Sequence, residues 1–265
     1  MNLFKKSILS LGFLLVSSAA LAEIKSEVVE YKDGKTVLEG AIVYDAALVQ
    51  TGKKLPAVVI VHNWMGVGDY VMMRAQQMAE MGYVAFVADI YGKGVRPQTV
   101  KEAAELAGKY RSGDRKELRS RARAAFETLK KHKSVDAKKI SAMGYCFGGT
   151  VALDMARIGL PLAGAISFHG GLASATAGDA KKIKTKILVL HGAIDPFVPE
   201  SEVLQFQKEL NEAGVNYEFV SYSGAVHSFT EKAAGNDVKA GAAYNEQADK
   251  RSFVAVKNFL TEVNQ

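Results

Sequence analysis

The sequence predicts an α/β fold with a mostly parallel sheet of about eight strands and helices on both faces. Apolar runs of strand length alternate with helical patterns along the chain, which is typical of repeated β-α units. Two of these runs, residues 56–62 and 83–89, are continuously apolar, as strands buried on both faces usually are. The chain has 265 residues, 48% hydrophobic and 23% charged, so we expect one domain from residue 23 to 265.

The individual elements follow from the same patterns. Residues 27–31 and 37–44 are predicted to form an opening hairpin that turns at Asp33-Gly34. Further strands are expected at residues 140–145, 163–169, 186–191 and 215–222. Helices are expected at residues 72–81, 100–132 in two pieces broken near Ser112-Gly113, 147–158, 202–213 and 242–260. Because ligands of such sheets bind at the C-terminal ends of strands, the chemistry is expected there.

The first 22 residues have the pattern of a cleaved signal peptide. Lys5 and Lys6 precede a mostly apolar run at residues 8–16, and Ala20-Leu21-Ala22 supplies the small residues that a signal peptidase reads. An uncleaved anchor is the alternative, but the apolar run is short for a bilayer span. We therefore predict cleavage after Ala22, a periplasmic or secreted protein, and no stable membrane span afterwards.

The charge of the chain is mildly positive. The formal net charge of +6 falls by two when Lys5 and Lys6 are removed with the signal. The basic residues concentrate between residues 109 and 133, where apolar residues recur at helical spacing. We expect these cations on the outer face of an amphipathic helix, in water, with attraction to an anionic surface as the alternative. We predict a monomer with no nucleic-acid partner.

The single cysteine, Cys146, lies in the strongest motif of the sequence. Residues 144–149 read GYCFGG between an apolar strand and a helix, which is the G-x-C-x-G form of a nucleophile elbow. Glycines relieve the crowding of a sharp strand-to-helix turn, and the helix N-terminus favours a thiolate. A buried structural cysteine is the alternative. With no second cysteine, no internal disulfide forms.

Two further candidates follow later strands. Asp195 lies in the loop after the strand at 186–191, where a carboxylate can orient an imidazole; an Asx turn before Pro196 is the alternative. His227 follows the last predicted strand, and a surface histidine is the alternative there. The chain order of nucleophile, acid and histidine is that of the α/β-hydrolase triad, so we predict an α/β-hydrolase fold with a Cys-His-Asp triad.

An oxyanion hole in this fold uses two backbone N–H groups. One belongs to the residue after the nucleophile, here Phe147, and the other to the loop after an early strand, here HNWMGV with Trp64 as candidate. Trp64 also fits a core or pocket-wall position. His169, beside Gly170-Gly171, is a candidate for the lining of the pocket.

Three motifs, GYCFGG, HGAIDPFVP and GAVHSF, resemble the dienelactone hydrolase family, and the resemblance extends from Tyr31 to the end of the chain. It implies an α/β-hydrolase that opens a lactone or carboxylic ester through an acyl-cysteine. By position, Cys146 is the nucleophile, His227 the base and Asp195 its orienting partner. The resemblance implies no cofactor, and we assign no metal ligand.

Three positions depart from the family pattern. Asn63 stands where the family has a glutamate, and Lys93 and Glu231 stand where two arginines hold the substrate carboxylate. Asn63, Lys93, His169 and Phe229 are our candidates for the substrate pocket. These departures also motivate a rival hypothesis, an exported binding protein on the same fold that does not catalyse. A redox-active thiol is a third reading, which lacks a second cysteine to resolve a sulfenic acid.

Overall fold

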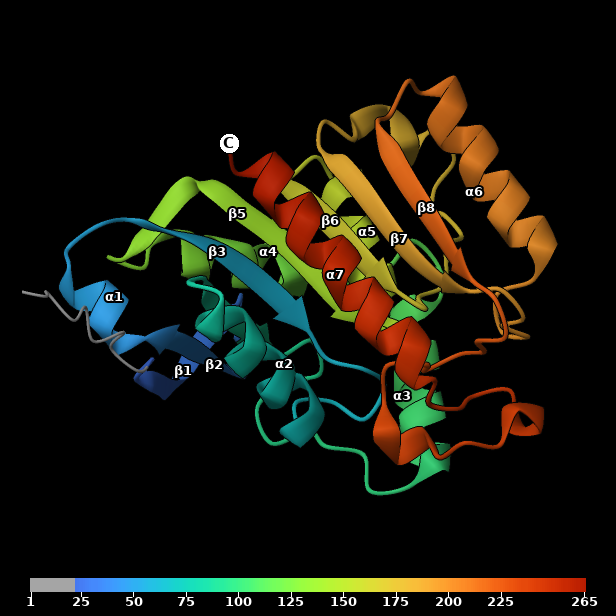
Figure 1. Ribbon diagram of the computed structural model, residues 1–265, viewed down its shortest axis with the longest axis horizontal. Helices are drawn as coiled ribbons and strands as arrows, with labels where there is room; N and C mark the ends of the chain where they lie inside the picture. The colour runs from blue at the N-terminus through green and yellow to red at the C-terminus, as the bar shows by residue number, and fades with distance from the viewer. Residues whose placement is uncertain (1–21) are drawn as a thin grey trace, which may run out of the picture.

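A computed structural model describes residues 22–265 and contains one eight-stranded sheet in the order β1-β2-β4-β3-β5-β6-β7-β8 (Figure 1). The signal peptide predicted at residues 1–22 lies outside the described residues, apart from Ala22. The strands are β1 (Ile24–Asp33), β2 (Thr36–Asp45), β3 (Leu55–Val61), β4 (Val84–Ala88), β5 (Val135–Tyr145), β6 (Gly164–Phe168), β7 (Lys186–Gly192) and β8 (Tyr217–Tyr222). The strands from β3 to β8 run parallel, and the antiparallel β1–β2 hairpin pairs with β4 at one edge.

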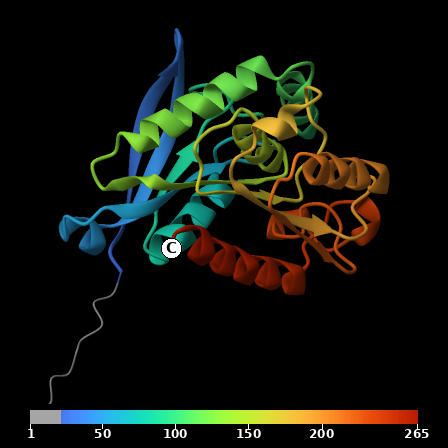
Figure 2. The same ribbon diagram turned by 90° about the horizontal axis from the view of Figure 1, so that it is seen from above.

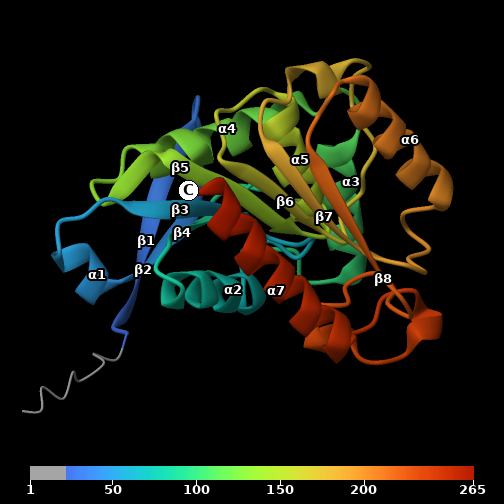
Figure 3. The same ribbon diagram turned by 45° about the horizontal axis from the view of Figure 1, so that its top comes forward.

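Helices cover both faces of the sheet, as Figure 2 shows. They are α1 (Ala46–Gln50), α2 (Asp69–Glu80), α3 (Val100–Arg111), α4 (Lys116–Lys130), α5 (Phe147–Arg157), α6 (Glu200–Glu212) and α7 (Glu246–Val263), with 3₁₀ turns at Asp179–Lys182, Lys232–Ala234 and Val238–Ala240. Helices α2 and α7 lie side by side on one face (Figure 3), and α3 to α6 pack with the other core cluster. The predicted α/β-hydrolase architecture is confirmed.

The apolar runs form the centre of the core. All of residues 57–61 in β3 and 84–88 in β4 are fully buried, because these strands have neighbours on both sides and helices on both faces. Alternate residues point to opposite faces, so Val59 packs with the α4–α5 layer while Ile60 packs with the α2–α7 layer. Burial on this scale removes much apolar surface from water and holds the strand ends in place.

Several element boundaries differ from the prediction. Strand β5 begins five residues earlier than expected, at Val135, and helix α2 begins three residues earlier, at Asp69. The closing helix begins at Glu246, because Asn245 caps it by accepting a hydrogen bond from the Ala248 N–H at 3.0 Å. Residues 242–245 instead run as an extended segment, in which the Ala243 N–H donates to the His227 carbonyl at 3.0 Å. This segment therefore supports the loop that carries His227.

The expectation that the cations of residues 109–133 face water is wrong in part. Arg121 is buried and donates to the Ile90 and Tyr91 carbonyls at 2.8 Å each. Arg115 and Arg119 reach Asp154, a fully buried residue of α5, at 3.3 and 3.2 Å. A buried carboxylate attracts the cations inward because an unpaired charge in the core is costly. No helix in residues 22–265 has the length and apolar character to cross a bilayer.

Removing the Asp154 carboxylate should destabilise the fold. Asp154 also contacts the buried Arg157 at 3.4 Å, so Asp154→Ala leaves three guanidinium groups around an empty position. We expect urea unfolding to show a loss of about 3 kcal/mol. The control is Glu105→Ala, which removes an exposed ion pair to Lys101 and should change stability by less than about 0.5 kcal/mol. Equal effects of the two substitutions would contradict this account.

Candidate active site

The turn between β5 and α5 carries the predicted nucleophile, Cys146. Its backbone has φ 54° and ψ −114°, a conformation that residues with a Cβ rarely adopt. A Cβ on Gly144 would lie 2.0 Å from the Gly148 carbonyl oxygen, and one on Gly148 would lie 2.3 Å from the Val61 carbonyl oxygen. Glycine at both positions therefore lets the strand turn sharply into the helix, and the Cys146 side chain is lifted off the sheet.

The Cys146 thiol lies at the N-terminus of α5 and the residue is only partly buried. The Phe147 backbone N–H donates a hydrogen bond to the sulfur, and the helix dipole adds to the positive potential at this end. Both effects favour a thiolate over a thiol. The local backbone thus supplies part of the activation before any other side chain takes part.

His227 and Asp195 complete a contiguous group with Cys146. The carboxyl ends of β5, β7 and β8 lie at one edge of the sheet, so the loops that follow them meet there (Figure 1). The His227 Nδ1 lies 2.8 Å from the buried Asp195 Oδ2. The His227 ring also lies close enough to Cys146 for the two groups to shift each other's pKa. The structure therefore brings together the three residues predicted as a triad.

Electrostatics favour an ion pair between the sulfur and the ring. Burial alone would raise the pKa of Cys146, but the charge and hydrogen bond of His227 and the Phe147 N–H bring it below its usual value. Burial alone would lower the pKa of His227, but the thiolate and the hydrogen bond to Asp195 raise it to about 10. Since each charge stabilises the other, both shifts favour a thiolate facing an imidazolium over a neutral thiol beside a neutral imidazole.

The backbone of the loop after β3 is held by Asn63. The Asn63 Oδ1 accepts from the Met65 N–H at 2.9 Å, and the Asn63 carbonyl accepts from the Gly66 N–H at 3.2 Å. The Trp64 carbonyl accepts from the Tyr91 hydroxyl at 3.0 Å. Within residues 22–265 the Trp64 N–H has no acceptor, so it remains available to a substrate oxygen, as the predicted oxyanion hole requires.

Comparison with known proteins agrees with this fold and this site. The sequence profile of the dienelactone hydrolase family matches residues 44–264. The chain belongs to this family. It is therefore a hydrolase of the dienelactone hydrolase type, within the larger class of α/β-hydrolases.

Several relatives are similar over most of their length. A probable 2-oxo-3-(5-oxofuran-2-ylidene)propanoate lactonase from Bradyrhizobium sp. is 29% identical over 218 residues, which covers 78% of this chain and 87% of the relative. The solved structure named m3DLH is 36% identical with a TM-score of 0.85, covering 91% of this chain and 98% of that one. A dienelactone hydrolase-like promiscuous phosphotriesterase from metagenomic libraries is 34% identical, with a TM-score of 0.84 and the same coverage.

Two of the three departures from the family pattern contact each other. The Asn63 Nδ2 donates to both carboxylate oxygens of Glu231, at 3.1 and 3.0 Å. Burial raises the pKa of Glu231, while the hydrogen bond from Asn63 and the nearby His227 lower it, and the net shift is upward. Glu231 makes no salt bridge to another residue in the described part of the chain. The hydrogen bonds therefore hold the Glu231 carboxylate beside the loop after β3, which carries Trp64. Glu231 itself is four residues after His227 in the chain.

Two candidate pocket residues have partners of their own. The Lys93 ammonium pairs with Glu30 and Glu39 of the β1–β2 hairpin, and its role in the substrate pocket stays a prediction. Two carboxylates on adjacent strands hold it there. Phe229 is fully buried and packs on Tyr222 and His169, with ring centroids 5.4 and 5.1 Å apart, so it supports the site from behind rather than lining it.

Residues that the sequence patterns did not single out also border the site. Phe197 is 60% exposed, and its ring centroid lies 5.4 Å from that of His227. Ile194 is 54% exposed in the same loop. Phe197 therefore presents an exposed apolar ring beside the imidazole, and Ile194 adds a second exposed apolar side chain to the same loop. The sequence HGAIDPFVP could have indicated these two residues, because apolar residues there flank an acidic residue in a loop.

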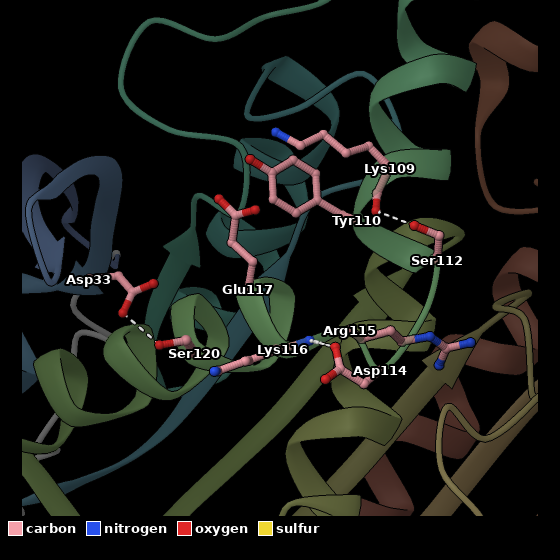
Figure 4. Close-up of a pocket in the computed structure, with 9 residues that line it drawn as sticks. All are labelled: Asp33, Lys109, Tyr110, Ser112, Asp114, Arg115, Lys116, Glu117 and Ser120. Carbon is pink, nitrogen blue, oxygen red and sulfur yellow. Dashed lines mark hydrogen bonds between the residues drawn. The ribbon is translucent and has the colours of Figure 1, made fainter.

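A separate hollow lies away from these residues. Its volume is about 470 Å³, and it opens between the tip of the β1–β2 hairpin, the end of α3 and the start of α4 (Figure 4). Its lining is polar and includes Asp33, Lys109, Arg115 and Glu117. The Asp114 carboxylate accepts a hydrogen bond from the Lys116 backbone N–H. The Asp33 carboxylate accepts one from the Ser120 hydroxyl. None of the triad residues lines this hollow, so it does not serve the same chemistry.

The elbow geometry can be tested with a pair of glycine substitutions. Gly148→Ala should destabilise the protein by about 3 kcal/mol or shift the turn, because the added Cβ meets backbone that cannot move away. Gly108→Ala is the matched control: a Cβ there meets nothing within 4 Å, and alanine should stabilise helix α3 by about 0.5 to 1 kcal/mol. Thermal unfolding measures both. A Gly148→Ala protein as stable as Gly108→Ala would contradict the described turn.

Proposed function

We propose that the protein is an exported hydrolase that cleaves carboxylic esters or lactones through an acyl-cysteine intermediate. The observation that supports this most is the contact of Cys146 with His227, and of His227 with Asp195, on a strained elbow at a helix N-terminus. Family membership supports the hydrolase class, and the hydrogen-bonded group supports the cysteine route.

The proposed reaction has two halves. The Cys146 thiolate attacks the carbonyl carbon, and the oxyanion accepts from the backbone N–H groups of Phe147 and Trp64. The imidazolium of His227 gives its proton to the departing alkoxide, which leaves a thioester and a neutral imidazole. His227 then takes a proton from water, the hydroxide attacks the thioester, and the acid departs as the thiolate re-forms. Asp195 keeps the Nδ1 proton in place throughout, so the other nitrogen faces the reaction.

The surroundings of the triad support a substrate that is apolar near its scissile bond. Phe197 presents apolar surface next to His227, and Ile194 is an exposed apolar residue of the same loop. The Glu231 carboxylate would repel a negatively charged group of the substrate placed beside it, because like charges in a partly buried setting repel. We therefore propose esters or lactones with no carboxylate facing Glu231. A neutral phosphotriester belongs in the same assay, since a similar solved protein is described as a promiscuous phosphotriesterase.

The experiment compares four purified proteins: wild type, Cys146→Ala, His227→Ala and the control Lys101→Ala, which removes an exposed ammonium paired with Glu105. With short aryl esters and lactones, we expect wild-type turnover, a loss of about 10³-fold or more in both site variants, and no change in the control. Intact mass spectra of quenched wild type should show acyl mass that is absent from Cys146→Ala. The same spectra of protein exported from cells test whether the chain begins at Glu23, as the predicted signal cleavage requires.

The rival hypothesis, a binding protein that does not catalyse, gives the opposite pattern. It rests on Asn63 and Glu231, which differ from the family residues at their positions. It requires that wild type binds an ester without turnover and without acyl mass at Cys146. Full turnover by Cys146→Ala would contradict the cysteine mechanism while leaving the hydrolase class intact.

A further inference from the structure

His169 is a buried histidine that the proposed reaction does not use. Its ring contacts the backbone of Cys146, not the sulfur. It follows β6 and is 1% exposed. Its Nδ1 lies 3.2 Å from the Cys146 backbone nitrogen, which also donates to the Phe168 carbonyl at 3.0 Å. His169 itself has φ 38°, so two residues in the left-handed region lie next to each other at the ends of β5 and β6. Such strain persists only where the surroundings hold it.

The second ring nitrogen of His169 leads to the loop of His227. The His169 Nε2 lies 2.8 Å from the Thr230 Oγ1, and Thr230 is three residues beyond His227. The Thr230 hydroxyl in turn lies 2.6 Å from the Tyr70 hydroxyl of α2. The Thr230 carbonyl accepts from the buried Arg74 at 2.7 Å. The loop is therefore anchored to His169 and to helix α2 at a single residue.

These contacts determine the hydrogen positions on the His169 ring. Because the Cys146 N–H is a donor, the Nδ1 that faces it must be an acceptor without a hydrogen. The Nε2 then carries the proton and donates to Thr230, whose own hydroxyl hydrogen is left for Tyr70. Burial, followed by the nearby charges of His227 and Arg74, holds the pKa of His169 well below its usual value. The ring is therefore neutral at neutral pH.

The charges around His169 make its neutrality important. The ring centroids of His169 and His227 are 5.2 Å apart in an edge-to-face arrangement. Arg74 of α2 and His191 of β7 also act on the ring, and both lower its pKa. A second cation at His169 would repel the His227 imidazolium and would point an N–H at the Cys146 N–H. Either effect would weaken the ion pair on which the proposed reaction rests.

We propose that His169 is a positioning residue: as the neutral Nε2–H tautomer, it ties the Cys146 backbone to the His227 loop through Thr230. The two halves of the triad belong to strands that are not adjacent, since β6 and β7 lie between β5 and β8. His169, at the end of β6, spans part of that gap by hydrogen bonds. It touches no reacting atom, and its effect is on the distance and alignment between thiolate and imidazolium. The effect on turnover rests on the proposed function, whereas the tautomer does not.

The first test needs no substitution. Nitrogen NMR of histidine-labelled wild type should show His169 as the neutral Nε2–H tautomer, without titration between about pH 5 and 8. His169→Asn identifies its signals by their loss. An Nδ1–H tautomer, or a midpoint within that range, would overturn the proposal whether or not the protein hydrolyses esters.

The second test compares Thr230→Val with Thr230→Ser. Valine keeps the shape of threonine and removes the hydroxyl, whereas serine retains it, so serine should restore what valine loses. We expect Thr230→Val to lower kcat, and to slow the alkylation of Cys146 by iodoacetamide at neutral pH, by about fivefold to tenfold, with KM unchanged. The midpoint of the alkylation pH profile should rise. Thr230→Ser should stay within about twofold of wild type on each measure.

The outcomes separate this inference from the proposed function. A folded Thr230→Val protein with the wild-type alkylation profile would overturn the positioning role. If wild type hydrolyses no ester but shows the expected tautomer and the expected alkylation shift, the proposed function fails and the link through His169 stands. Circular dichroism and thermal unfolding of both Thr230 variants confirm that the comparison is made between folded proteins.

Discussion

The strand-to-helix turn at Cys146 is the constraint on which the rest of the site depends. The turn exists because Gly144 and Gly148 allow backbone contacts that a Cβ would block. It puts the sulfur at the N-terminus of α5, in contact with the Phe147 N–H. Strand β5, paired with the buried β3, holds one end of the turn and the buried helix α5 holds the other, so the strain at Cys146 is borne by the core.

The charges of Cys146 and His227 depend on the position of the sulfur at this turn. A thiolate at the elbow raises the pKa of His227, and the imidazolium lowers that of Cys146, while Asp195 holds the ring from its other side. His169 supplies the neutral contact between the two halves. Glu231 adds a carboxylate close by without forming a salt bridge in the described part of the chain. The site thus combines the Cys146–His227 pair held by Asp195, the neutral His169 ring and the carboxylate of Glu231.

Local patterns were sufficient to predict the strands and the glycine-flanked turn at Cys146, because each depends on neighbours in the chain. The partners of the charged side chains could not be predicted in this way, because they come from residues distant in sequence. Lys93 turns to Glu30 and Glu39, which are distant in sequence but adjacent in the sheet. Arg115 and Arg119 turn inward to Asp154, which the helical pattern alone does not reveal as a buried anion. The role of Thr230 likewise depends on a histidine 61 residues away.

The resting thiolate is the central claim, and an ultraviolet titration of its absorbance tests it most directly. The difference between wild type and Cys146→Ser isolates the signal of the single sulfur anion. The account predicts that the thiolate forms at a lower pH than that of a free cysteine and that His227→Ala moves its appearance to higher pH. Absorbance that appears only near about pH 8.5, as in a free cysteine, and is unchanged in His227→Ala would contradict the account.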